Sequence, residues 1–169
     1  MRQLILFRHA KAEPSRLGLE DHDRALALQG WDDAPRVARA TLARGGQPDL
    51  ILCSTARRCR QTLEAVEDMY SGISVEFRGE LYLAEPNRML SLAVQAAAET
   101  GASKVMMIAH NPGTRELATR LSPMGSILAS NMRRSFPTAS MAVLQRMDSA
   151  QDDWDLASFI TPADLRNLS

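Results

Sequence analysis

The stretch Leu4-Ile5-Leu6-Phe7-Arg8-His9 places a cation and an imidazole directly after an apolar run near the start of the chain. A short apolar run of this kind predicts a buried β-strand. In open α/β sheets, ligands bind outside the carboxyl ends of the strands. Arg8 and His9 are therefore candidates for a site in which the arginine holds an anionic group and the histidine reacts with it.

Length, composition and charge narrow the class of protein. The chain has 169 residues, which favours a single domain over residues 1–169, and its 45% hydrophobic content is enough for a core. Basic and acidic residues are balanced at 20 each. A net charge of zero argues against broad electrostatic binding to nucleic acid or to an anionic membrane surface.

The sequence contains no signal for a membrane or for export. No stretch reaches the roughly 18 apolar residues of a membrane span. The apolar run before Arg8 is too short for the core of a signal peptide. The only cysteines, Cys53 and Cys59, form no CxxC motif and are expected to be reduced thiols. We therefore expect a cytoplasmic protein.

Apolar runs alternate with helical periodicities along the chain. The predicted strands cover residues 3–7, 50–53, 73–77, 104–109, 141–146 and 154–160. The predicted helices cover residues 29–44, 56–70, 86–100 and 114–121, whereas 122–140 is expected to be irregular and 148–153 to form an acidic turn. This order predicts an α/β fold, a three-layer sandwich in which helices flank both faces of a mainly parallel central sheet.

Residues 10–28 are polar and irregular, and they directly follow Arg8 and His9. A loop of this length inside a compact domain is uncommon unless it has a function. We expect it to shape the site. The alternative is a mobile excursion over the surface.

Polar residues follow three of the predicted strands, as Arg8-His9, Ser54 to Arg58, and His110-Asn111. Parallel strands would bring these residues to one edge of the sheet. Arg58 falls in the first turn of a helix, where free N–H groups and the helix dipole favour an anion. A solvated basic turn is the alternative interpretation of the arginines at this helix start.

A metal site is the main rival for the histidines. His9 and His110 could both bind zinc, but a third or fourth ligand is required, and neither His22 nor Cys53 is a convincing one. The chain has no HExxH motif, P-loop, GxGxxG or GxSxG. A histidine nucleophile held between arginine clamps, without metal or cofactor, remains the preferred chemistry.

Three segments resemble the histidine phosphatase superfamily. Arg8-His9-Ala10 is similar to its Arg-His-Gly signature, the stretch Ser54 to Thr62 is similar to its Ser-Pro…Arg-Ala…Gln-Thr segment, and Ile108 to Pro112 is similar to its second-histidine segment. Further phrases resemble the small SixA-type branch, named for a phosphohistidine phosphatase: Asp23-Arg24-Ala25-Leu26, Leu81-Tyr82, Phe136-Pro137-Thr138 and Ile160-Thr161-Pro162.

The resemblance implies a role for each site residue. His9 would be the nucleophile that takes the phosphoryl group, Arg8 and Arg58 would neutralise its oxygens, and His110 would complete the pocket. Asn111 would help to bind the substrate. Physical chemistry agrees, because phosphoryl transfer mainly needs positioning and charge stabilisation. The nearby arginines should also lower the pKa of His9 and keep it neutral.

The general acid is where the chain departs from larger family members. Those carry an acidic residue in an inserted cap, and no large cap insertion is evident here. Glu80 and Glu85 lie in the corresponding region and are candidates for the acid. Either could instead simply start the next helix, where an acidic residue is ordinary.

The resulting prediction is a metal-independent phosphatase with a phosphohistidine intermediate, acting on phosphohistidine in a protein. One alternative is a small-molecule phosphomonoesterase of the same superfamily. Another is a catalytically silent phosphate-binding module, which the intact His9 disfavours because binding needs only the arginines.

Overall fold

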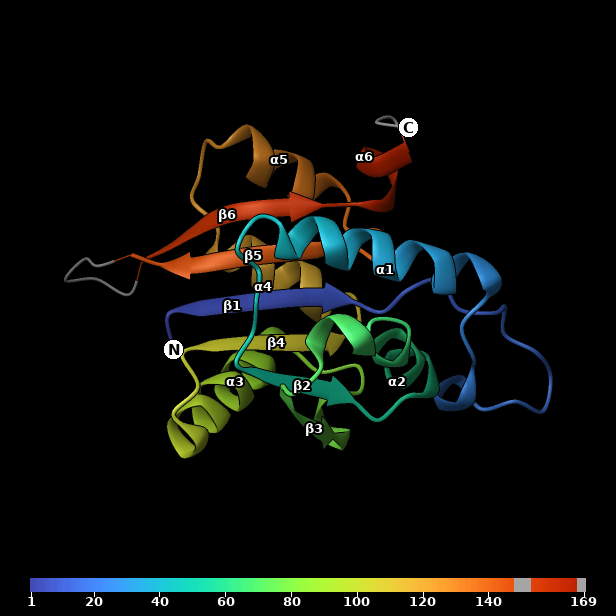
Figure 1. The fold of residues 1–169 in the computed structure, drawn as a ribbon. Helices are drawn as coiled ribbons and strands as arrows, with labels where there is room; N and C mark the ends of the chain where they lie inside the picture. The colour runs from blue at the N-terminus through green and yellow to red at the C-terminus, as the bar shows by residue number, and fades with distance from the viewer. Residues whose placement is uncertain (148–152, 167–169) are drawn as a thin grey trace.

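The computed structural model describes residues 1–147 and 153–166. Their centre is a six-stranded sheet of order β3-β2-β4-β1-β5-β6 (Figure 1). The strands are β1 (Gln3–Arg8), β2 (Leu50–Ser54), β3 (Ser74–Arg78), β4 (Lys104–Ala109), β5 (Met141–Arg146) and β6 (Trp154–Ile160). All six coincide with predicted strands to within a residue or two.

The sheet is mainly parallel, as predicted. Strand β1 pairs in parallel with β4, and β2 pairs in parallel with both β3 and β4. The two closing strands are antiparallel, because β5 pairs with β1 and β6 pairs with β5 in that sense. Consequently the carboxyl ends of β1, β2 and β4 lie at the same edge of the sheet.

Helices cover both faces of the sheet and complete the three predicted layers (Figure 1). One face packs against α1 (Leu28–Leu42), α2 (Arg57–Glu64) and α6 (Pro162–Arg166), and the other packs against α3 (Pro86–Thr100), α4 (Gly113–Leu121) and α5 (Ile127–Arg134). Three short 3-10 helices are η1 (Asp21–Asp23), η2 (Glu67–Tyr70) and η3 (Gly79–Leu81).

The apolar run that precedes Arg8 belongs to both cores. Leu4 and Leu6 pack into the layer with α3, α4 and α5, whereas Ile5 and Phe7 pack into the layer with α1 and α2. Successive side chains of a strand point to opposite faces. A strand buried on both faces is therefore apolar without alternation, as the sequence shows.

Two predictions about helices were wrong. The helix predicted over 56–70 ends at Glu64 and continues only as the separate 3-10 helix η2. Residues 122–140 are not irregular throughout, because they contain α5. Its apolar signal is weak, since only Ala129 and Met132 are buried, but Ser126 caps its start by accepting a hydrogen bond from Ala129 N.

The acidic turn predicted at 148–153 lies outside the described residues except for Asp153. Within the described residues, no helix has both the length and the apolar character needed to cross a bilayer.

Candidate active site

The carboxyl edge of the sheet brings together three of the predicted site residues. The backbone N–H of His9 donates to Ala109 O at 3.0 Å, which joins the end of β1 to the end of β4. Arg58 Nε lies 3.3 Å from His9 Nε2, and the rings of His9 and His110 are 5.2 Å apart. Residues far apart in the sequence thus converge as the strand order predicted.

These side chains line a cavity of about 440 Å³. Its described walls are formed by Arg8, His9, Lys11, Ala12, Asp21, Arg24, Arg58, Leu83, His110, Asn111 and Thr138. Four of these residues carry a positive charge and one carries a carboxylate. The balance of charge favours an anionic ligand.

Hydrogen bonds determine which nitrogen of His9 carries the proton. His9 Nδ1 lies 2.8 Å from the carbonyl oxygen of Ala10, which can only accept, so Nδ1 is the protonated nitrogen. The guanidinium of Arg58 can only donate, and its Nε faces His9 Nε2. The lone pair of Nε2 is therefore directed toward the arginine and the cavity, as a nucleophile requires.

The protonation state of His9 agrees with this tautomer. Its pKa is lowered to about 4, mainly by burial; the charges of Arg58 and Arg8 also lower it, whereas the Ala10 hydrogen bond raises it. The predicted direction is confirmed, but the main cause is burial rather than the arginines. At neutral pH the imidazole is uncharged and able to attack.

His110 is a second neutral imidazole, almost completely buried. Its Nδ1 accepts a hydrogen bond from Arg58 Nη2 at 3.2 Å, so the proton is on Nε2, which lies 2.8 Å from Ser54 Oγ. Burial lowers its pKa to about 3, with smaller contributions from His9 and Arg58. Ser54 at the end of β2 thus fixes the ring that faces Arg58.

Arg58 is held on several sides. Besides the two histidines, its Nη1 donates to the backbone oxygen of Asp21 and its Nη2 donates to the Asp21 carboxylate at 2.9 Å. Thr62 donates to the carbonyl oxygen of Arg58 and accepts from Ala10 N at 3.0 Å, which connects α2 with the segment after β1. The first turn of α2 is therefore a fixed support for the guanidinium.

Arg8 and Asn111 share one anchor on the other side of the cavity. Arg8 Nη1 and Asn111 Nδ2 both donate to the carbonyl oxygen of Phe136, at 2.6 and 3.0 Å. The Nε of Arg8 is buried without a hydrogen-bond partner. A buried donor that lacks a partner is costly, and the side chain that carries it lines the cavity.

The long loop 10–28 lines the cavity, as predicted, and contributes residues that the sequence did not single out. Asp21 accepts hydrogen bonds from Arg24 at 2.8 Å and from Tyr82 at 2.8 Å, in addition to those from Arg58. These contacts, led by that of Arg24, hold the pKa of the Asp21 carboxyl well below its usual range. For Arg24, the available signal was the phrase Asp23-Arg24-Ala25-Leu26, which resembles the SixA-type branch.

The structure does not bring either glutamate candidate to the cavity. Glu80 lies in η3 and pairs with Arg88 at 3.6 Å, with both side chains about half exposed. Glu85 is the N-cap residue of α3 and is exposed. Glu85 matches the alternative interpretation, in which it starts the next helix, whereas Glu80 lies in the 3-10 helix η3 that precedes α3.

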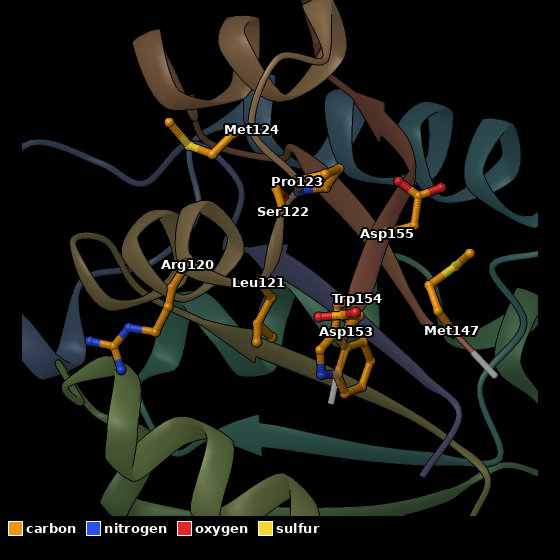
Figure 2. A pocket seen from close by; sticks show the side chains of 9 residues that line it. All are labelled: Arg120, Leu121, Ser122, Pro123, Met124, Met147, Asp153, Trp154 and Asp155. Atoms are coloured by element: carbon orange, nitrogen blue, oxygen red, sulfur yellow. The ribbon is translucent and has the colours of Figure 1, made fainter. Parts of the chain in front are cut away.

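A second cavity lies at the opposite end of the sheet. It has a volume of about 520 Å³ and is lined by the end of α4, the segment that follows it, and the adjoining ends of β5 and β6 (Figure 2). It contains none of the predicted site residues. Among residues 1–147 and 153–166, no three His, Cys, Asp or Glu side chains are arranged to hold a metal ion.

Comparisons with known proteins place the sequence among relatives of one superfamily. The sequence model of the histidine phosphatase superfamily (branch 1) matches residues 4–85. An uncharacterized chloroplastic protein of Arabidopsis thaliana is 34% identical over 129 residues, which are 72% of this chain and 59% of that protein. An uncharacterized protein of Mycobacterium tuberculosis is 33% identical over 82% of this chain and 85% of its own length.

A solved structure agrees over nearly the whole chain. The protein from Agrobacterium tumefaciens assigned as the phosphohistidine phosphatase SixA is 35% identical, with a TM-score of 0.80 over 95% of this chain and 98% of that one. This likeness spans nearly the whole chain, whereas the match to the family model ends at residue 85, before His110. The chain belongs to the histidine phosphatase superfamily, in its small SixA-like branch, and is a phosphatase.

Proposed function

We propose that this phosphatase transfers a phosphoryl group to Nε2 of His9 and then hydrolyses the phosphohistidine intermediate. The observation that carries the proposal is the tautomer of His9. Its Nδ1 proton is engaged by Ala10 O, and its Nε2 lone pair faces Arg58 in a cationic cavity. A neutral histidine in this state attacks without first losing a proton.

Arg8 and Arg58 would bind the oxygens of the transferred group. Both arginines line the cavity beside His9, and the Nε of Arg58 faces the nucleophile. Preorganised donors of this kind stabilise the charge of a transition state without reorganisation. His110 would keep Arg58 aligned through its Nδ1. Asn111 would help to bind the substrate and would support Arg8, because both side chains donate to the carbonyl oxygen of Phe136.

Both chemical steps take place at the imidazole ring of His9. In the first, the lone pair of His9 Nε2 forms a bond to phosphorus, and the bond from phosphorus to the leaving group breaks with its electron pair departing on that group. Because Nδ1 keeps its proton, the phosphorylated His9 is a protonated imidazole, which is a good leaving group. In the second, water attacks phosphorus, the Nε2–P bond breaks with its electron pair returning to Nε2, and a proton of the water is released.

We further propose that the substrate is phosphohistidine in a partner protein. Asp21 has the only carboxylate among the described residues of the cavity, and its low pKa makes it an acceptor rather than a proton donor. An imidazole protonated on its distal nitrogen leaves as a neutral molecule and needs no acid, because its conjugate acid has a pKa of about 6.5. The name of the Agrobacterium relative supports the same substrate class.

The reaction is expected to be independent of metal and to take place in the cytoplasm. His9 and the arginines supply the nucleophile and the positive charge that a metal would otherwise provide. Cys53 and Cys59 are both free thiols in the structure, in keeping with a reducing compartment.

A simple assay tests the proposal. Hydrolysis of a chromogenic aryl phosphate should persist after prolonged chelation and should disappear in His9→Ala, while inorganic phosphate still binds to that variant. Retained turnover in His9→Ala would exclude His9 as the nucleophile. Activity that is lost on chelation and restored by zinc, manganese or magnesium would support a metal mechanism instead. Faster cleavage of sugar phosphates than of phosphohistidine would favour the small-molecule alternative.

A further inference from the structure

Leu83 is an apolar residue at an otherwise polar site. Its side chain lines the candidate active-site cavity and is 52% exposed. The other apolar member of the described lining, Ala12, is small and buried. A leucine cannot bind the charged phosphoryl group that the arginines and histidines would bind. Its position in the cavity wall therefore suggests contact with an apolar part of the substrate.

The backbone of Leu83 has an unusual conformation. Its φ is +51°, in the left-handed region that residues other than glycine rarely occupy. Such conformations persist only when the surrounding structure determines them, and they gather at functional sites.

Both neighbours of Leu83 are anchored. On one side, the Tyr82 hydroxyl donates to Asp21 at 2.8 Å, and the rings of Tyr82 and His110 pack edge to face with centroids 5.4 Å apart. On the other side, the carbonyl oxygen of Ala84 packs so closely on Gly113, at the start of α4, that a Cβ there would collide with it. Leu83 is thus held between the catalytic network and α4.

We propose that Leu83 is a specificity-determining residue that packs against the ring of the leaving group. The inference rests on the proposed function, and it deepens that function by assigning a wall to the departing imidazole. A leaving group must lie opposite the attacking nitrogen and therefore toward the opening of the cavity, where Leu83 is half exposed. Imidazole has a flat apolar face that a leucine can cover, whereas ammonia has none.

Two substrates with P–N bonds separate this contact from the rest of catalysis. N-phosphoimidazole and phosphoramidate would deliver the same phosphoryl group to His9, but only the first has a ring to release. The readout is the ratio of their kcat/KM values, which covers the steps up to departure of the leaving group. A variant that is partly misfolded lowers both values and leaves the ratio unchanged.

The variants are chosen so that backbone strain does not obscure the result. Asn tolerates the left-handed conformation, so Leu83→Asn should fold while losing the apolar contact. Leu83→Met keeps an apolar side chain of similar volume. Val94→Ala on α3 is the matched control, because Val94 is equally exposed, at 52%, and does not line this cavity.

The expected result is a fall of about tenfold in the ratio for Leu83→Asn, which corresponds to about 1.4 kcal/mol. Leu83→Met should restore most of the ratio, and Val94→Ala should keep the wild-type value. An unchanged ratio in Leu83→Asn would overturn the role of Leu83 while leaving the proposed function intact. If the wild-type protein cleaves neither compound, the proposed function fails and this inference fails with it.

Discussion

Asp21 holds Arg58 by two separate groups, because its backbone oxygen accepts from Nη1 and its carboxylate accepts from Nη2 at 2.9 Å. The guanidinium is almost fully buried, whereas the Asp21 side chain is 46% exposed at the edge of the cavity. Asp21 comes from the loop after β1 and Arg58 from the start of α2. Their pairing therefore ties the loop to the element that carries the central cation.

Asp21→Asn should impair turnover more than it impairs anion binding. The amide keeps the shape but loses the charge that orients Arg58, and a small displacement of a positioning group can cost roughly 10²-fold in rate. Removing a negative charge should leave inorganic phosphate bound as tightly as before or more tightly. Asp23→Asn is the control, because Asp23 does not line this cavity.

The measurement is kcat for an aryl phosphate together with the inhibition constant of phosphate. A parallel loss of both would indicate general damage to the fold rather than positioning. Wild-type kcat in Asp21→Asn would show that the backbone contact of Asp21 is sufficient to orient Arg58.

Arg58→Lys should lose most of the activity. Lysine offers a single ammonium where the guanidinium now reaches His9, His110 and Asp21 at once. The expected decrease in kcat is about 10²–10³-fold, or roughly 2.7–4 kcal/mol of transition-state stabilisation. Arg57→Lys is the control, because Arg57 is exposed and lines a different cavity. A near-normal kcat in Arg58→Lys would contradict the role that we give to the planar guanidinium group of Arg58.

Stability should decrease as the pH falls below the pKa of an unfolded histidine. His9 and His110 have pKa values lowered to about 4 and about 3, against about 6.5 when unfolded. Between these values the unfolded chain binds more protons, so acid favours unfolding. The loss between pH 7 and pH 5 should be about 2 kcal/mol for a buried histidine such as His110.

Urea unfolding at the two pH values checks this prediction. His110→Asn should show a smaller decrease between pH 7 and pH 5 than the wild-type protein, whatever its absolute stability. His22→Asn is the control, since the side chain of His22 is 40% exposed. An equal decrease in wild type and His110→Asn would mean that His110 does not remain neutral in the folded state.

Phosphohistidine should be cleaved much faster than serine or sugar phosphates. An alkoxide leaving group without a positioned acid forfeits roughly 10²–10⁴ in rate. Glu80→Gln and Glu85→Gln should each change the hydrolysis of phosphohistidine little, because neither residue lines the cavity. Rates for the substrate series in wild type and both variants provide the check. Loss of all turnover in either variant would identify a missed acid.

The fold and the central residues could be predicted because local signals and topology agree. The apolar run of β1 and the parallel strand order together bring His9, Arg58 and His110 to one edge. Asp21 and Leu83 could not be predicted in this way. Their positions depend on how an irregular loop and a turn pack against α2 and α4, and neither segment has a periodic pattern that reports on such packing.

The same limit explains the helices that were misjudged. Periodicity reports burial of one face, and α5 buries only Ala129 and Met132 among polar residues. The periodicity also does not show where an α-helix ends and a 3-10 helix begins, so the sequence could not predict the division of residues 57–70 into α2 and η2. The type of residue alone can also mislead. Glu85 has the carboxyl group of a proton donor, but it is the N-cap residue of α3.

The most direct test of the account is to trap the phosphorylated enzyme. After rapid quenching of a reaction with labelled phosphohistidine, the protein should carry an acid-labile, base-stable phosphate that maps to His9. His9→Ala should carry no label and show no turnover, although it still binds inorganic phosphate. A label on any other residue, or full turnover in His9→Ala, would contradict the proposed phosphoryl transfer to His9.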